Sequence, residues 1–195
     1  MKKELEIRDI INIGVYTVLH FLCVALMAML LFVPQTIVFV GLLEGFLGAI
    51  PIMIFLQKAK KPGMLAIMGI LLGILTVITG RPVVAALFGI AGGIITELIW
   101  RKAGYKNINA GVICCATMSL WVGGMELPMF FGYRDNYLAS LEKGYGTQYV
   151  KIMRSLTPDW MFIALIVMCL LGGVLGGMFA KRLLRKHFEK IGTAS

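Results

Sequence analysis

Hydrophobic positions along this chain gather into six long stretches that are separated by short polar connections. A helix needs about 20 apolar residues to cross a hydrocarbon core about 30 Å thick. The stretches cover residues 10–33, 36–56, 64–78, 82–100, 108–131 and 159–180. A backbone in lipid must satisfy its own hydrogen bonds, so continuous apolar stretches of this length predict helices. We expect an all-α membrane protein, a bundle of six transmembrane helices that forms one integral membrane domain over residues 1–195.

One connection, residues 132–158, is far longer than the others, and long loops are often functional. Within it, Asp135 and Asn136 can cap a short helix that Gly144 and Gly146 break, and Thr147 can start a second helical turn. The sequence Thr157-Pro158-Asp159 then predicts the start of the last span, with Thr157 as its N-cap.

This long loop is also rich in tyrosine. Four of the six tyrosines of the chain lie in it: Tyr133, Tyr137, Tyr145 and Tyr149. Two interpretations stay open. The rings can form an interfacial aromatic belt on helices that lie along the membrane surface. Alternatively, they form an aromatic lid over an external pocket.

Charge adds an orientation to this picture. Fourteen of the 19 Lys and Arg residues lie on one set of alternate connections and at the two termini. This set is Lys2, Lys3, Arg8, Lys58, Lys60, Lys61, Arg101, Lys102, Lys106, Lys181, Arg182, Arg185, Lys186 and Lys190. Because cytoplasmic loops carry the excess of basic residues, both termini are predicted in the cytoplasm and residues 132–158 outside.

Composition excludes a soluble protein. Hydrophobic residues make up 59% of the chain, charged residues 15%, and the mean hydropathy is +0.87. A soluble domain of this composition would expose too much apolar surface. The net charge of +9 therefore indicates orientation signals and contacts with the lipid bilayer, and we expect no nucleic acid partner.

Glycines four residues apart mark several spans. The pairs are Gly69 and Gly73, Gly89 and Gly93, Gly172 and Gly176, and Gly173 and Gly177. Such spacing lets helix backbones approach closely in a membrane. It favours packing inside the bundle, and the second interpretation is a surface that docks another membrane subunit.

Ionisable residues inside spans are costly and therefore indicate function. Glu126 has the strongest case, because Pro128 and the preceding glycines break the helix there, and irregular helix is tolerated beside a cavity. Glu44 and His20 lie in other spans, where they can form a buried pair or contact a ligand. A lone histidine on an apolar helix is more often a structural group with satisfied hydrogen bonds. Glu97 is expected to form an i,i+4 pair with Arg101.

These residues suggest an external binding pocket with an apolar wall and a few fixed polar groups. The predicted substrate-binding residues are Glu126, Arg81, Trp121, Met125, Met129, Phe130, Tyr133, Tyr137, Glu44 and His20. Arg81, in an external turn, can bind a carboxylate or phosphate, or it can contact lipid headgroups at the rim.

Signatures of catalysis and of energy supply are missing from the sequence. It contains no phosphate-binding GxxxxGK[ST] loop, no HExxH and no GxSxG, and its two histidines cannot form a three-histidine zinc site. Cys23, Cys114, Cys115 and Cys169 lie inside spans and are expected to be packing residues. We expect no enzyme, no metal and no cofactor, and uphill transport would need a partner.

At this point the chain resembles the S components of energy-coupling-factor (ECF) transporters, and more narrowly the Trep_Strep (MptD-type) group. The resemblance is carried by KELEIRDIINIGVYTVLHF at residues 3–21, GGIITELIWRKAGYKN at 92–107 and GGVLGGMFAKRLLRKHFEKIG at 172–192. It implies a bundle in the bacterial cell membrane that captures a micronutrient outside: a vitamin, a vitamin precursor or a haem-like tetrapyrrole. It also implies partners, namely a transmembrane coupling subunit and two cytoplasmic ATPases.

In the wider family, an Ala-x-x-x-Ala pattern in the first helix meets the coupling subunit. This chain departs from that pattern, and its nearest small residues are Gly14, Thr17, Ala25 and Ala28. They are the predicted docking residues. Two other functions stay open: a membrane enzyme acting on a lipid-linked substrate, with Glu126 or Glu44 as general base, and a structural or assembly subunit.

Overall fold

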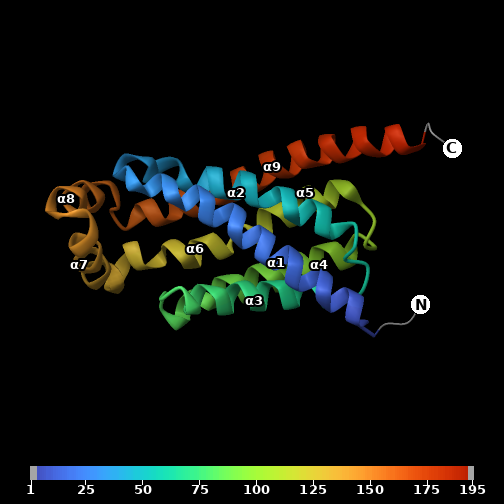
Figure 1. Ribbon diagram of the computed structural model, residues 1–195, viewed down its shortest axis with the longest axis horizontal. Coiled ribbons are helices and arrows are strands. Elements are labelled where there is room, and N and C mark those ends of the chain that lie inside the picture. The colour runs from blue at the N-terminus through green and yellow to red at the C-terminus, as the bar shows by residue number, and fades with distance from the viewer. Residues whose placement is uncertain (1–3, 193–195) are drawn as a thin grey trace.

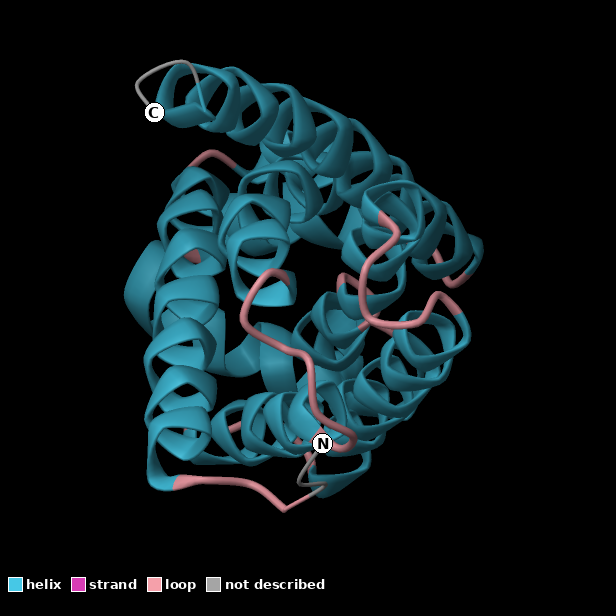
Figure 2. Ribbon diagram, turned by 90° about the vertical axis from the view of Figure 1, so that its right-hand side faces the viewer, coloured by secondary structure: helices cyan, strands magenta, loops and turns pink. Residues whose placement is uncertain are grey.

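The computed structural model describes residues 4–192 and contains only helices and loops in that range (Figures 1 and 2). The α-helices are α1 (Ile7–Ala28), α2 (Ile37–Leu56), α3 (Met64–Ile78), α4 (Ala86–Lys102), α5 (Ile108–Met118), α6 (Trp121–Glu126), α7 (Arg134–Tyr145), α8 (Thr147–Leu156) and α9 (Trp160–Gly192). Short 3-10 turns are η1 (Met29–Phe32), η2 (Pro34–Thr36), η3 (Val83–Ala85), η4 (Leu127–Met129) and η5 (Phe131–Tyr133). The all-α prediction is confirmed for these residues. Lys2 and Lys3 of the predicted basic set lie outside them.

Five segments are long and apolar enough to cross a membrane. They are Ile7–Phe32, Pro34–Leu56, Val83–Lys102, Ile108–Met129 and Trp160–Leu184. The remaining apolar helix, α3, has 15 residues and is shorter than a full crossing requires. The multi-pass architecture is therefore established, and the count of six spans stays a prediction.

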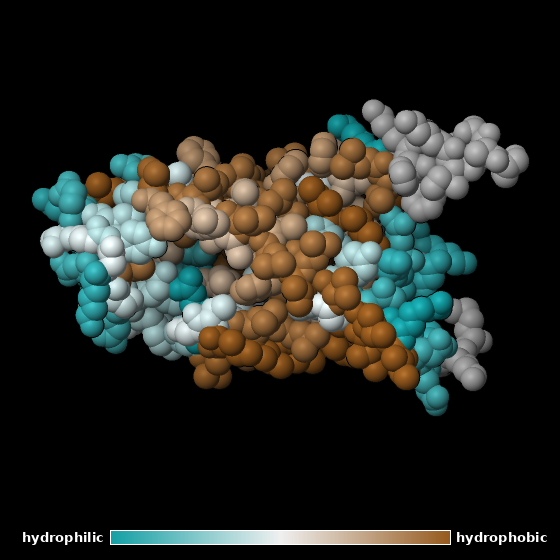
Figure 3. Space-filling view, in the orientation of Figure 1, coloured by the Kyte–Doolittle hydropathy of each residue, from teal (hydrophilic) through white to brown (hydrophobic). Residues whose placement is uncertain are grey.

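The molecule is elongated and has two polar ends (Figure 3). The N-terminus, the C-terminus and the α2–α3 and α4–α5 connections lie at one end, which we call the basic end (Figure 1). Helices α7 and α8 lie at the opposite end, which we call the loop end (Figure 1). A broad apolar surface separates the two ends (Figure 3).

Helix α1 shows why this surface belongs in lipid. Its buried residues form one stripe at helical spacing: Asp9, Ile13, Thr17, His20 and Val24. The rest of its surface exposes large apolar side chains, including Val15, Val18 and Leu22. A helix that is apolar on its outer face and packs through one stripe is suited to a bundle in a membrane.

The most extensive packing joins α2 to α9, and glycine makes it possible. A Cβ atom at Gly172 would collide with the carbonyl oxygen of Leu42, and one at Gly176 would collide with that of Phe46. On the other face of α9, a Cβ atom at Gly173 would lie 2.6 Å from the Cα of Ala116 in α5. Only glycine permits such close approach of two helix backbones.

Helices α3 and α4 pack in the same way. A Cβ atom at Gly69 would lie 2.5 Å from the carbonyl oxygen of Gly89 and 2.5 Å from the Cα of Gly93. The prediction that the spaced glycines serve packing inside the bundle is therefore confirmed. These glycine faces are occupied by the chain itself.

Candidate functional site

Three charged side chains from three separate elements approach one another in the half of the bundle nearer the loop end. Glu44 comes from the middle of α2, Glu126 is the last residue of α6, and Arg81 lies in the turn between α3 and η3. Glu44 and Glu126 are each 1% exposed. Among the described residues, Glu44 Oε2, Glu126 Oε2 and Arg81 Nε are buried and have no hydrogen-bond partner.

The position of Glu126 follows from the broken helix that the sequence predicts. Pro128 cannot donate a helical hydrogen bond, and the chain changes from α6 to the 3-10 turn η4 at this point. Gly124 lets the backbone of α6 approach Ala85, where a Cβ atom would collide with the Ala85 carbonyl oxygen. The break and the close packing together hold the carboxylate of Glu126 inside the bundle.

Arg81 supplies the positive charge of the cluster. Burial lowers the pKa of its guanidinium, but Tyr137, Glu126 and Glu44 raise this pKa by more, so that the net shift is upward. The guanidinium carbon lies 5.0 Å from the centre of the Tyr137 ring, which is a cation–π contact. Burial raises the pKa of Tyr137 itself, so its phenol stays neutral. Two carboxyl groups thus share one guanidinium.

His20 has a different role. Its Nδ1 lies 2.8 Å from the carbonyl oxygen of Gly48, and the Trp121 indole nitrogen donates to its Nε2 over 2.6 Å. Since Nε2 accepts a hydrogen bond, Nδ1 carries the proton and the imidazole is neutral. Both ring nitrogens are used, so His20 links α1, α2 and α6 and does not pair with Glu44.

The predicted apolar wall is assembled next to these groups, except at one position. Trp121, Met129 and Phe130 are buried, and Met125 is half-buried. Tyr133 is 42% exposed on the surface turn η5. The structure therefore buries Trp121, Met129 and Phe130 and places Tyr133 at the surface.

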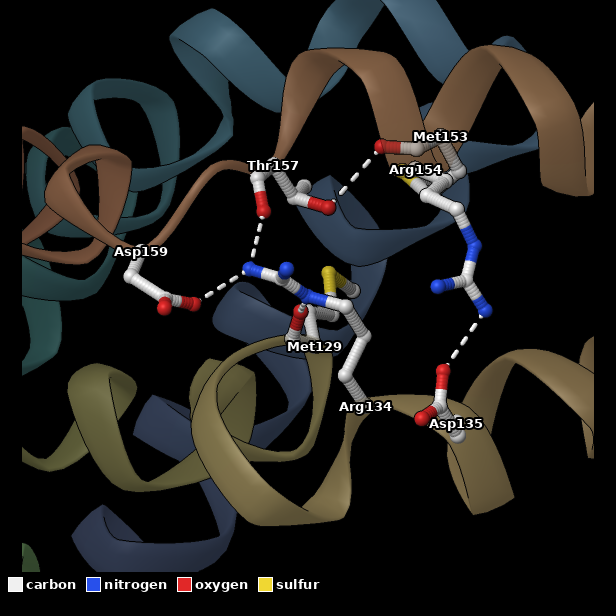
Figure 4. Close-up of polar contacts among 7 residues, drawn as sticks. All are labelled: Met129, Arg134, Asp135, Met153, Arg154, Thr157 and Asp159. Atoms are coloured by element: carbon white, nitrogen blue, oxygen red, sulfur yellow. Dashed lines mark hydrogen bonds and ion pairs between the residues drawn. The ribbon is translucent and has the colours of Figure 1, made fainter.

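Helices α7 and α8 form a cap at the loop end, and Arg134 fastens it (Figure 4). Its Nε donates to the carbonyl oxygen of Met129 over 3.1 Å. The other end of the guanidinium donates to the Thr157 carbonyl oxygen over 2.5 Å and to the Asp159 carboxylate over 2.6 Å. One side chain thus connects the broken fifth segment to the start of α9.

Further contacts hold the two cap helices together and attach them to the bundle. The Tyr149 hydroxyl donates to the Leu31 carbonyl oxygen over 2.6 Å, and Arg154 pairs with Asp135 at 2.7 Å (Figure 4). Leu138 and Met153 are buried beneath the two helices. This inward packing fits a cover over the loop end, whereas the opening of that cover as a lid stays a prediction.

Three local predictions were wrong. Helix α7 begins at Arg134 with Tyr133 as its N-cap, so Asp135 lies inside the first turn and does not cap the helix. The Thr157 hydroxyl donates to the Met153 carbonyl oxygen over 2.9 Å, so Thr157 ends α8 and does not cap α9. Glu97 does not pair with Arg101. Its carboxylate accepts hydrogen bonds from the Leu65 amide and the Tyr105 hydroxyl, both at 3.0 Å. Glu97 thereby caps the N-terminus of α3 from the neighbouring helix α4.

The predicted docking residues lie on one side of α1 at helical spacing, but they differ in exposure. Gly14 lines an apolar groove of about 450 Å³ on the outer surface, together with Val15, Val18, Leu19 and Leu22. Thr17 is buried, and its hydroxyl donates to the Ile13 carbonyl oxygen over 2.7 Å. Ala25 and Ala28 are half-buried. Of the four residues, Gly14 alone lines this groove.

Sequence reasoning did not find the role of Arg134. Its acidic partner, Asp159, lies 25 residues further along the chain, and the carbonyl groups that it binds leave no trace in the sequence. Only the cluster of turn residues around it signals that the chain changes direction there.

Fold and site together define a multi-pass α-helical membrane protein with a charged cluster buried beneath a helical cap. The chain belongs to the Trep_Strep family of hypothetical bacterial integral membrane proteins, whose family model matches residues 7–190. No curated protein and no solved structure matches the chain. The family description agrees with a bacterial membrane protein and assigns no ligand or reaction.

Proposed function

We propose that this protein is the substrate-binding S component of an ECF-type importer. The observation that carries the proposal is the buried cluster of Glu44, Glu126 and Arg81, in which three polar atoms have no partner within the described residues. Buried polar groups are nearly always satisfied, and exceptions in native proteins mark functional positions. A substrate that enters beneath the cap would supply the missing partners.

The orientation and the partners form part of this proposal. The basic end faces the cytoplasm with both termini, the loop end faces outside, and α3 is the sixth span, short enough to require local thinning of the bilayer. The bound micronutrient passes to a transmembrane coupling subunit energised by two ATPases. The resemblance in the segments at residues 3–21, 92–107 and 172–192 supports these partners.

The charges of the cluster favour one kind of substrate. Two carboxyl groups face one guanidinium, so the site is short of hydrogen-bond donors and of positive charge. A vitamin or vitamin precursor with an amino or ring N–H group would satisfy Glu44 and Glu126, and an acceptor group on the same molecule would satisfy Arg81. A haem-like tetrapyrrole brings carboxylates, for which only Arg81 offers a charged partner.

The test begins with mass spectrometry of small molecules that co-purify with the protein from bacterial membranes. The identified compound should raise the melting temperature of the purified chain, because a ligand that binds only the folded state stabilises it. Glu126→Gln should weaken binding by at least about tenfold, since a hydrogen bond to a charged group contributes about 1.5–3 kcal/mol.

Glu142→Gln is the matched control. Glu142 lies exposed on α7, so this substitution removes one carboxylate outside the cluster and should leave the affinity unchanged. If no small molecule co-purifies, and vitamins, haem and porphyrins all leave the melting temperature unchanged, the proposal fails.

One observation favours a second candidate, a membrane enzyme acting on a lipid-linked substrate. Neighbouring carboxyl groups that share an environment can divide the roles of general acid and general base. In that case Glu126→Gln would leave ligand binding intact and abolish product formation. Loss of binding in the same variant assigns the cluster to capture instead.

A further inference from the structure

A second site lies at the basic end, far along the bundle from the charged cluster. Here a cavity of about 420 Å³ opens between the end of α2, the end of α4 and the start of α5. Its lining consists of Met53, Leu56, Gln57, Lys60, Trp100, Tyr105, Lys106 and Ile108. Nothing in the proposed capture of a substrate uses this cavity.

The unused polar groups of this cavity include three hydrogen-bond donors. Gln57 Nε2 is buried and has no partner within the described part of the chain. Lys60 and Lys106 are exposed, and neither forms an ion pair with an acidic side chain among the described residues. The Lys61 side chain, by contrast, is fully engaged, at 2.6 Å from Asp9 and 3.0 Å from Glu6.

The two other polar side chains of the lining are already satisfied. The Trp100 indole nitrogen donates to the Ala59 carbonyl oxygen over 2.7 Å. The Tyr105 hydroxyl donates to the Glu97 carboxylate over 3.0 Å. What the cavity offers a ligand is therefore two ammonium groups and one amide, all suited to an anion.

A smaller cavity of about 270 Å³ shares Gln57 and Lys60 with the first one. Its lining adds Arg8 and Lys58, which are basic, and Asp9, which is acidic. Lys61 pairs with both Asp9 and Glu6, so the positive charge around Gln57 comes from Arg8, Lys58 and Lys60. Arg8 and Lys58 extend the positive surface around the opening.

The remaining lining is apolar and points to an amphiphile. Met53 and Leu56 are buried core residues at the base of the cavity, and Ile108 is exposed at its edge. The lining of the cavity thus combines apolar residues of the bundle with lysines of the basic end. Basic pockets between helices at this level suit the headgroup of an acidic lipid.

We propose that this cavity binds the phosphate of an anionic phospholipid. Lys60, Lys106 and the Gln57 amide donate to the phosphate oxygens, while the acyl chains leave along the apolar surface beside Ile108. A soluble phosphate ester offers the same phosphate without acyl chains. The apolar part of the lining therefore assigns the site to the lipid.

The test uses the full chain in detergent and native mass spectrometry with phosphatidylglycerol. One molecule should stay bound, and the Lys60→Gln, Lys106→Gln double variant should bind it at least about tenfold more weakly, since each basic residue near a membrane surface contributes to lipid attraction. The matched control is the Lys102→Gln, Arg182→Gln double variant. It removes the same charge from exposed positions at the same end, outside the cavity lining, and should keep the affinity.

Three results would overturn the assignment. Equal weakening in the control would mean that total charge, and not the cavity, holds the lipid. Equal binding of zwitterionic phosphatidylcholine would remove the role of the net negative charge. Competition by glycerol 1-phosphate at the same concentration as phosphatidylglycerol would transfer the site to a soluble phosphate ester. Gln57→Leu, which removes the buried amide and keeps the charge, should weaken binding less than the double lysine variant.

Discussion

Buried carboxylates in the two halves of this bundle differ in how completely their oxygens are hydrogen-bonded. Near the basic end, the carboxylate of Glu97 accepts hydrogen bonds from the Leu65 amide and the Tyr105 hydroxyl. In the half nearer the loop end, Glu44 and Glu126 are buried more completely, and each has an oxygen without a partner among the described residues. Glu97 is therefore a buried carboxylate with hydrogen bonds to both oxygens, whereas Glu44 and Glu126 are buried carboxylates that each lack a partner for one oxygen.

The difference in hydrogen bonding offers a criterion for distinguishing acidic residues that stabilise a membrane bundle from those that are candidates for binding. A buried carboxylate is stable only if its hydrogen bonds compensate for lost hydration. Glu97 meets that condition with groups of the chain itself, including the positive N-terminal end of α3. Glu44 and Glu126 do not, although both lie near the guanidinium of Arg81. Their incomplete pairing is the feature that the proposed binding of a substrate would complete.

The largest expected effect on stability comes from removing the hydrogen bonds of Glu97. Glu97→Leu keeps a similar volume but leaves the Leu65 amide and the Tyr105 hydroxyl without an acceptor. We expect a loss of about 2–3 kcal/mol in unfolding free energy, because a buried donor without a partner costs about 1–3 kcal/mol. Titration of the purified protein with a denaturing detergent measures this. Glu97→Gln keeps one acceptor oxygen and should lose about half as much; equal stability of Glu97→Leu and the wild type would show that Glu97 is not structural.

The same substitution at Glu126, whose carboxylate lacks one hydrogen-bond partner, should have a smaller effect on stability. Glu126→Leu removes one of two carboxyl groups that share Arg81, so the guanidinium keeps Glu44 as its partner. We expect the unfolding free energy of the ligand-free protein to stay within about 1 kcal/mol of the wild type or to rise, because the carboxylate that is removed has lost hydration without full compensation and Arg81 keeps one acidic partner.

Titration of Glu97→Leu and Glu126→Leu with the same denaturing detergent compares their losses of unfolding free energy directly. A loss at Glu126→Leu as large as that at Glu97→Leu would make both acids structural and would remove the basis for a binding site at Glu126. The melting temperature in the presence of the co-purified compound gives the second readout, and here only the Glu126 variant should lose the stabilisation.

The sequence was sufficient for most of the helices because the bilayer fixes their length. The stretch predicted at 64–78 coincides with α3, and the one predicted at 36–56 begins one residue before α2. Glu44, Glu126 and Arg81 were also found, since an ionisable residue in or beside an apolar span is rare enough to attract attention. Each of these predictions depends on a property of one segment.

Predictions failed where a contact joins distant segments. Thr157-Pro158-Asp159 reads as a helix start, but Asp159 is bound by Arg134, which lies 25 residues earlier in the chain. The bond of Thr157 to Met153 is local, and there the end of α8 competes with the start of α9 for the same residue. Likewise, the hydrogen bond between His20 and Trp121 depends on how α1 and α6 are rotated about their axes. Glycine spacing identified close packing, but only the structure shows which helices meet.

The smallest expected effect is a fall of the melting temperature at high pH, to which one tyrosine at each end of the bundle contributes. Burial raises the pKa of Tyr105 at the basic end to about 12, and burial also raises that of Tyr149 in the cap to about 12. A phenol whose pKa is higher in the folded than in the unfolded state stabilises the fold below pH 10, and this contribution is lost as the pH rises toward 12. We expect the melting temperature to fall across this window.

Substituting phenylalanine for each tyrosine in turn shows which end of the bundle causes the fall in melting temperature. Tyr105→Phe removes the donor to Glu97, and Tyr149→Phe removes the donor to the Leu31 carbonyl oxygen. Each variant should melt earlier than the wild type below pH 10 and should show a shallower fall between pH 10 and 12. Because Tyr105 supports a buried carboxylate, its variant should lose more stability than the Tyr149 variant, whose partner is a neutral carbonyl group. The reverse order would mean that the contact of Tyr149 with the bundle, and not the Glu97 network, is the stronger of the two.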